Sequence, residues 1–146
     1  MTPTLTHVAL HVYDFEACLR FYRDYCGMQV VHERPGSKQD SRVVWISEPG
    51  RERELIFVLI PGGACRDDEA RDFSHLGFAV GTRETVDQIA ERARSEGRLI
   101  WEPTEEDYPV GYYCGVRDPD GNHVEFSFGQ PLGPGAEQGD RQRLPS

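Results

Sequence analysis

Apolar and polar residues alternate in two segments that resemble each other. Residues 6–12 read THVALHV and residues 74–80 read SHLGFAV, so His7 and His75 occupy the same position. Strict alternation over this length predicts a strand with one buried face. In the first segment the apolar face carries Val8, Leu10 and Val12, and the other face carries His7, Ala9 and His11.

Each of these strands leads into a segment with the apolar spacing of a helix. Asp14 and Thr82 stand where an N-cap is expected, and Gly27 and Gly97 stand where a left-handed residue would end a helix. The pattern therefore predicts one helix in each half of the chain. The apolar stripes are Phe15, Cys18, Leu19, Tyr22 and Tyr25 in the first helix, and Val86, Ile89, Ala90 and Ala93 in the second.

Three further apolar runs follow each helix, and a turn separates the last two runs of each half. Each half is thus expected to fold as βαβββ, which places the chain in the α+β class. Because one such half has too little core to stand alone, we expect the two modules to form one curved mixed β-sheet with a central cavity. The predicted strands cover 28–31, 42–47 and 55–60, then 99–101, 111–116 and 124–128.

The chain has 146 residues, the usual size of one domain. We expect residues 1–129 to form this domain, with modules at 5–62 and 73–129. From Gly129 onward the composition changes to Gly, Pro and polar residues, which predicts a flexible tail at 130–146.

Acidic residues exceed basic ones by 25 to 16, for a net charge of −9. This balance disfavours nucleic-acid partners and anionic membrane surfaces. No apolar run approaches the length of a spanning helix, and the N-terminus lacks a signal pattern. The four cysteines show no CxxC spacing and indicate buried, reduced thiols. We expect a cytoplasmic protein that acts on a small molecule.

Three residues with metal-ligating side chains occupy corresponding or converging positions in this fold. His7 and His75 open equivalent strands, and Glu125 lies on the side of the last strand opposite to Val124 and Phe126. A carboxylate in such an apolar strand is costly to bury unless it is paired or binds a cation. Two imidazoles and one carboxylate form the open sites of non-haem iron and catalytic zinc proteins. The pattern predicts a metal site at His7, His75 and Glu125.

The chain resembles the vicinal oxygen chelate superfamily, which includes glyoxalase I, bleomycin and fosfomycin resistance proteins, methylmalonyl-CoA epimerase and extradiol dioxygenases. The resemblance rests on THVALHV and FYRDYCGM, on SHLGFAV, and on DPDGNHVEF, and covers about residues 5 to 129. It implies paired βαβββ modules, a metal in the cavity and a homodimer. His7, His75 and Glu125 fall on three of the ligand positions of the family.

Departures from the family patterns narrow the choice of activity. The fourth ligand of glyoxalase I, a Glu, would fall at Phe57 or Val58. The Tyr of extradiol dioxygenases would fall at Gly115, and their catalytic His has no counterpart between His75 and His123. The fosfomycin branch has a cation loop and basic ligands where this chain has an acidic segment at 105–111, which would repel a phosphonate. Bleomycin-type proteins lack the metal triad.

These considerations predict a divalent-metal-dependent enzyme, of lyase, isomerase or dioxygenase type, on a substrate chelated through two oxygens. The ion could be Fe, Mn, Ni, Zn or Co. Glu125 and His11 are the predicted catalytic residues, and His11, about 13 Å along the strand from His7, is expected in the pocket with Tyr113 and Phe57. The alternation of side chains along the strand does not decide whether Tyr112 or Tyr113 faces the pocket. The sequence also leaves open whether the metal site forms within one chain or across a dimer. The alternative is a non-catalytic protein that sequesters an antibiotic or aromatic metabolite.

Overall fold

The computed structural model describes residues 2–66 and 73–130. The predicted tail therefore lies outside the described residues, apart from Gln130. The described chain divides into two compact units. Unit 1 comprises residues 2–66 and 118–122, and unit 2 comprises residues 73–117 and 123–130.

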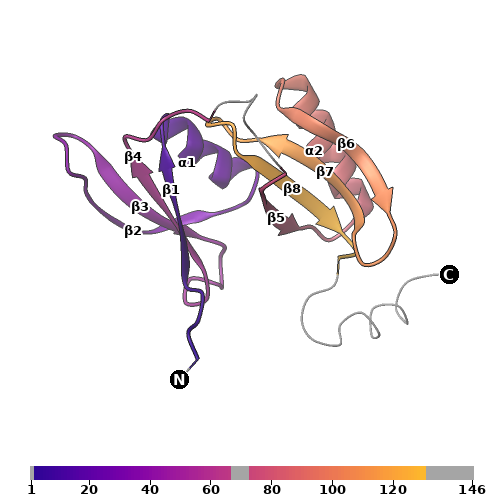
Figure 1. Ribbon diagram of the computed structural model, residues 1–146, viewed down its shortest axis with the longest axis horizontal. Coiled ribbons are helices and arrows are strands. Elements are labelled where there is room, and N and C mark those ends of the chain that lie inside the picture. Colours follow the sequence, from indigo (N-terminus) through magenta and orange to yellow (C-terminus); the bar gives the residue numbers. More distant parts are fainter. Residues whose placement is uncertain (1, 67–72, 131–146) are drawn as a thin grey trace. The chain divides into compact units, whose positions relative to one another are not determined.

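Unit 1 is a four-stranded mixed sheet with one helix (Figure 1). Its strand order is β1-β4-β3-β2, in which β1 runs parallel to β4 and the other neighbours are antiparallel. The elements are β1 (His7–Val12), α1 (Phe15–Asp24), β2 (Gln29–Pro35), β3 (Arg42–Ser47) and β4 (Ile56–Pro61).

Unit 2 repeats this topology, with the strand order β5-β8-β7-β6 and a parallel pair β5–β8. Both halves are thus βαβββ, and the predicted duplication within an α+β fold is confirmed. The elements are β5 (His75–Ala79), α2 (Arg83–Ser95), β6 (Leu99–Glu106), β7 (Gly111–Arg117) and β8 (His123–Phe128).

Both helices begin and end where the sequence predicts. The side chains of Asp14 and Thr82 accept hydrogen bonds, each 3.1 Å long, from the backbone N–H three residues further on. Gly27 and Gly97 follow the helices with φ of 68° and 70°, a left-handed conformation that favours glycine. Local cap chemistry therefore sets the length of each helix.

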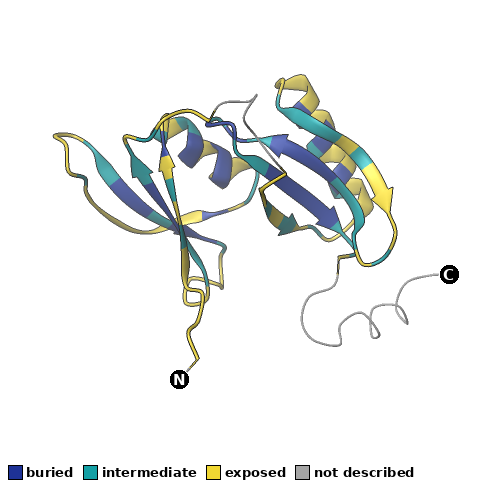
Figure 2. Cartoon of the chain, viewed as in Figure 1, coloured by how far each residue is buried: buried dark blue, intermediate teal, exposed yellow. Residues whose placement is uncertain are grey.

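The hydrophobic core of each unit lies between the helix and one face of its sheet (Figure 2). In unit 1 the ring of Tyr22 on α1 packs edge-on against Phe57 on β4, with 5.8 Å between the ring centroids. In unit 2 the thiol of Cys114 on β7 lies 3.7 Å from the carbonyl oxygen of Val86 on α2. The opposite face of each sheet is free of its helix, so functional side chains can gather there.

The turn between β7 and β8 belongs to unit 1 and places two buried aspartates beside α1. The Asp120 carboxylate accepts hydrogen bonds from the backbone N–H groups of Tyr13 and Asp14 at 2.9 to 3.1 Å. The Asp118 carboxylate accepts from the Tyr22 hydroxyl at 2.7 Å, and from the N–H groups of Asp120 and Asn122. Because donors surround both carboxylates, these acids hold the fold and have little capacity left for a cation.

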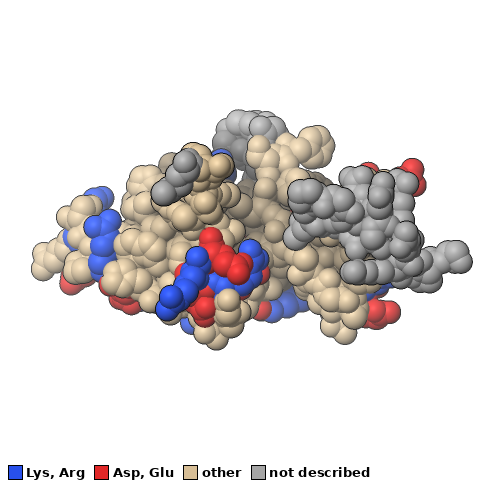
Figure 3. Space-filling view, turned by 90° about the horizontal axis from the view of Figure 1, so that it is seen from below, with Lys and Arg blue, Asp and Glu red and all other residues tan. Residues whose placement is uncertain are grey.

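Acidic and basic side chains lie side by side on the face shown in Figure 3. Several of them form ion pairs: Arg51 lies 2.8 Å from Glu48 and 2.9 Å from Glu54, and Arg42 lies 3.1 Å from Glu33. Local pairing therefore offsets part of the acidic excess. Neither described helix has the length and apolar character needed to cross a membrane.

Candidate metal centre

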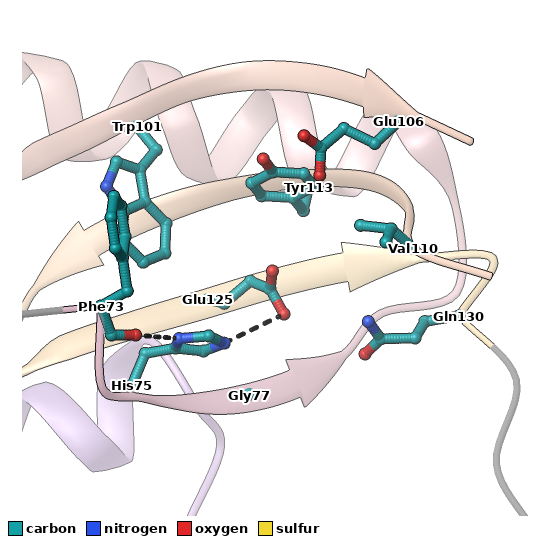
Figure 4. A pocket seen from close by; sticks show the side chains of 9 residues that line it. All are labelled: Phe73, His75, Gly77, Trp101, Glu106, Val110, Tyr113, Glu125 and Gln130. Atoms are coloured by element: carbon teal, nitrogen blue, oxygen red, sulfur yellow. Dashed lines mark hydrogen bonds and ion pairs between the residues drawn. The ribbon is translucent and has the colours of Figure 1, made fainter. Parts of the chain in front are cut away.

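A pocket of about 470 Å³ lies on the face of the second sheet that α2 leaves free. All four strands of unit 2 supply its lining, because paired residues in neighbouring strands point to the same face. Gly77 pairs with Glu125, Glu125 with Gly115, and Gly115 with Trp101. The lining residues, shown in Figure 4, are Phe73, His75, Gly77, Trp101, Glu106, Val110, Tyr113, Glu125 and Gln130.

His75 and Glu125 face each other across the floor of this pocket (Figure 4). The Nε2 atom of His75 lies 3.8 Å from Oε2 of Glu125, and its Nδ1 atom lies 2.7 Å from the carbonyl oxygen of Phe73. A carbonyl only accepts, so Nδ1 donates, and a neutral ring then presents the lone pair of Nε2 to the carboxylate. With the ring neutral, two electron-pair donors face each other, an arrangement that suits a cation between them.

Glu125 is a buried acid whose side chain opens into the pocket. The residue is 7% exposed, and burial is the main cause that raises its pKa, with a smaller contribution from the charge of Glu106 and opposition from His75. In the part of the chain that the structure describes, no hydrogen bond reaches its carboxylate. A bound cation would compensate this desolvation.

An aromatic wall stands beside His75. The Trp101 ring lies edge-on to His75 at 5.5 Å and to His123 at 5.4 Å, and Phe73 lies 6.3 Å from it. Gly115 makes room for the indole, because an added Cβ would lie 2.2 Å from Cε3 of Trp101. His123 is half-buried against Trp101. The wall restricts the orientation of the His75 ring.

Tyr113 and Glu106 form the opposite wall (Figure 4). Burial, followed by a hydrogen bond to Glu106 and the charge of that residue, raises the pKa of Tyr113. Tyr112 lies on the other face, where its hydroxyl donates to Asp87 and its ring contacts Arg83. The structure thus places Tyr113, and not Tyr112, at the pocket.

The donor set of the pocket fits a divalent cation. Ligand atoms roughly 2.1 Å from one ion lie about 3.0 to 3.4 Å apart in tetrahedral or octahedral sites. The 3.8 Å between His75 and Glu125 comes within a few tenths of an ångström of this spacing. Two ligands alone do not complete a site, and residues 2–66 and 73–130 contain no group of three His, Cys, Asp or Glu side chains placed to hold an ion.

His7 and His11 lie in unit 1, on the exposed face of β1. The hydroxyl of Thr6 lies 3.2 Å from Nδ1 of His7, and a Cβ added at Gly62 would lie 3.7 Å from Nε2 of His11. Neither histidine lines the pocket of unit 2. Their predicted roles as third ligand and as catalytic residue remain predictions.

Phe57 was predicted to line the pocket, and the structure places it elsewhere. It is 5% exposed and packs against Tyr22, on the face of the first sheet that α1 covers. The register also identifies the counterpart of Glu125 in unit 1: Val58 pairs with Ala9 as Glu125 pairs with Gly77. Valine therefore stands where a fourth carboxylate ligand would lie.

Pattern reasoning missed several lining residues, above all Trp101, Glu106 and Phe73. Trp101 and Glu106 belong to β6, which extends to residue 106 and not only to 101 as predicted. Side chains of β7 alternate between the two sheet faces, and residues paired with them on β6 point to the same faces. This relation was the signal that could have placed Trp101 and Glu106 at the pocket.

Comparisons with known proteins agree with this architecture. Residues 4–126 match the model of the Glyoxalase/Bleomycin resistance protein/Dioxygenase superfamily. A Pseudomonas aeruginosa protein named uncharacterized protein PA2024 is 58% identical over 137 residues, which is 94% of this chain and 96% of that protein.

Solved structures show the same fold at low sequence identity. A possible glyoxalase from Bacillus cereus superposes with a TM-score of 0.62 at 22% identity, over 86% of this chain and 99% of that chain. A mutant of the fosfomycin resistance protein FosX from Listeria monocytogenes, complexed with Mn(II) and 1S,2S-dihydroxypropylphosphonic acid, gives 0.69 at 19% identity, over 90% and 94% of the two chains. Two paired βαβββ modules are thus a shared framework.

Proposed function

The chain belongs to the glyoxalase/bleomycin resistance protein/dioxygenase superfamily, and on this basis we propose that it is a divalent-metal-dependent enzyme. The substrate would be a small oxygenated molecule bound through two neighbouring oxygens, and the reaction a lyase, isomerase or dioxygenase step. We propose His75, Glu125 and His7 as the ligands, with His7 supplied by the same chain or by a second copy in a homodimer.

The facing pair of His75 and Glu125 is the observation that carries this proposal. A buried carboxylate without a hydrogen-bond donor among the described residues faces Nε2 of His75 at 3.8 Å, while Nδ1 of the same ring donates to the Phe73 carbonyl. Such a carbonyl partner fixes the tautomer of a ligating histidine. The Mn(II) bound by the FosX mutant supports a divalent ion as the first to test.

The protein side of the mechanism follows from the pocket. A bound divalent ion would supply Lewis acidity toward a chelated carbonyl or enolate oxygen. His75 and Glu125 would hold the reacting end of the substrate, and Glu125, with its raised pKa, could also move a proton at its carboxylate. Trp101 and Phe73 provide apolar surface on one side of the pocket. His11 is proposed as a second proton-transfer group.

Metal analysis of reconstituted protein tests the proposal. Wild-type protein and the variants His75→Ala and Glu125→Gln are stripped, incubated with Mn(II) or Co(II), and assayed for bound metal. We expect each variant to lose more affinity than the roughly 10- to 100-fold that removal of an outer-shell partner costs, while His32→Ala, a change at an exposed histidine on β2, binds as wild type. Absence of bound ion in wild type, or equal affinity in His75→Ala, would refute the proposal.

The aromatic wall supports a second candidate, a protein that sequesters a planar antibiotic or metabolite without catalysis. Trp101, Phe73 and Tyr113 could hold such a ligand in metal-free protein. A thermal-shift screen separates the two candidates, because a ligand that binds the folded state alone raises the melting temperature. Stabilisation in metal-free protein, with no further gain from Mn(II), would favour sequestration.

A further inference from the structure

We propose that the substrate carries a positively charged group at the end remote from its chelating oxygens, and that Glu106 selects for it. This inference rests on the proposed function, because it assumes that His75 and Glu125 hold the reacting end. It concerns the other end of the same pocket, where Glu106 and Tyr113 stand (Figure 4).

The acidic side chains that line the pocket have no basic counterpart among its lining residues. Its nine lining residues include the carboxylates of Glu106 and Glu125, and neither Lys nor Arg. A divalent ion at His75 and Glu125 would use the charge of Glu125. Glu106 would then remain as a negative charge within reach of the far end of a bound molecule.

Glu106 differs in its partners from its neighbour in the chain. Glu105 makes an ion pair with Arg83, which lies over Tyr112 on the opposite face of the sheet. Glu106 makes no ion pair among the described residues, and its charge is one of the causes that raise the pKa of the Tyr113 hydroxyl. A neutral phenol beside this carboxylate leaves the charge of Glu106 in place.

The aromatic residues that line the pocket suit a flat, apolar segment that ends in a cation. Trp101, Phe73 and Tyr113 offer aromatic surfaces, and Phe73 is 82% exposed in unit 2. Aromatic faces attract ammonium groups as well as planar rings. The volume of about 470 Å³ is within the range of small-molecule sites. An anionic tail would meet Glu106 with like charge, so phosphonates and carboxylates are disfavoured.

Three catechols that share the same vicinal oxygens and differ in tail charge test the inference. The probes are 4-(2-aminoethyl)catechol, 4-ethylcatechol and 3,4-dihydroxyphenylacetate, titrated anaerobically at pH 7 into Co(II)-loaded full-length protein. We expect affinity to fall from the cation to the neutral probe to the anion, by about threefold to tenfold at each step. In 0.5 M NaCl the steps should shrink, because salt screens the partly exposed Glu106.

Variants of Glu106 assign the preference to this side chain. Glu106→Gln should bring the affinities of the three probes together, and Glu106→Lys should reverse their order. Glu105→Gln is the matched control, since it removes the neighbouring charge on the other face and should leave the order unchanged. Circular dichroism and cobalt content confirm that each variant is folded and loaded.

The outcomes separate this inference from the proposed function. A wild-type protein that takes up no metal overturns both. A loaded protein that binds none of the catechols, binds all three equally, or keeps the wild-type order in Glu106→Gln or Glu106→Lys, overturns the inference alone. Equal loss of the preference in Glu105→Gln also overturns it.

Discussion

Gly115→Ala is expected to destabilise the protein by displacing the aromatic wall of the pocket. The added Cβ would lie 2.2, 2.5 and 2.9 Å from three atoms of the Trp101 ring. Ordinary carbon contacts are about 3.5 to 4.0 Å, so the indole would have to move by more than an ångström. This movement would break its edge-on contacts with His75 and His123.

The expected cost is that of overpacking a buried position, about 1–3 kcal/mol in the free energy of unfolding. Gly77→Ala is the matched control on the same sheet face. Its Cβ would meet only Oε2 of Glu125 at 3.6 Å, an ordinary contact, and its backbone has no left-handed φ. Because alanine also restricts the unfolded chain, we expect Gly77→Ala to be neutral or stabilising by up to about 1 kcal/mol.

Urea denaturation followed by circular dichroism measures the free energies, and tryptophan fluorescence in a Trp45→Phe background reports on Trp101 alone. The midpoint should fall for Gly115→Ala at an unchanged slope, with a shift in the emission of Trp101. A change in the free energy of unfolding equal to that of Gly77→Ala, or unchanged emission, would show that the position of the indole does not depend on Gly115.

Three further predictions follow from buried groups. Tyr22→Phe removes the 2.7 Å hydrogen bond to buried Asp118 and should cost about 1.5–3 kcal/mol in urea denaturation. Burial, followed by the charge of Asp118, raises the pKa of Tyr22 well above 10.0. The stability that this phenol contributes is therefore complete below pH 10.0 and is lost as pH rises through the pKa of the folded state. The Tyr22→Phe variant should accordingly lose less stability in alkali than wild type. Burial likewise raises the pKa of Glu125 from 4.5, so metal-free wild type should lose stability as pH rises from there, and Glu125→Gln should not. In hydrogen exchange, Mn(II) should protect β5 and β8 in wild type and leave Glu125→Gln unchanged.

The elements that the sequence predicts well are those specified by local chemistry. The caps Asp14 and Thr82 are confirmed, as are the glycines that follow both helices. Strand β3 has the predicted bounds, 42–47, because a central strand buried on both sides reads as an unbroken apolar run. Such signals depend on a few neighbouring residues, so they can be recognised without knowledge of the tertiary structure.

Edge strands were predicted too short, and this error carried over to the site. Strand β2 is exposed along its whole length, and β6 contains Pro103 and three acidic residues. An edge strand needs no continuous apolar pattern and tolerates proline, so periodicity ends before the strand does. Glu106 was therefore assigned to an acidic segment beyond the strand, whereas the structure places it on a wall of the pocket.

Phe57 shows a different failure, in which residue type outweighed register. An aromatic residue in the last strand of a module is a plausible lining residue, but the pairing of Phe57 with Val8 puts it on the face that packs against α1. Strand parity between β1 and β4 cannot be obtained without knowing which residues are opposite each other. A one-residue difference in register exchanges the two faces.

The duplication is broken at the positions that form the pocket. Where unit 2 has Glu125, Gly115 and Trp101 in register across three strands, unit 1 has Val58, Trp45 and His32. A valine can be buried without a partner, whereas a carboxylate in that position raises the cost of folding until a cation compensates it. Hydrophobic packing is therefore enough for the sheet of unit 1. In unit 2, one buried acid and a glycine in a central strand lower the stability of the sheet. These same two residues, Glu125 and Gly115, supply the charge and the space that a ligand requires.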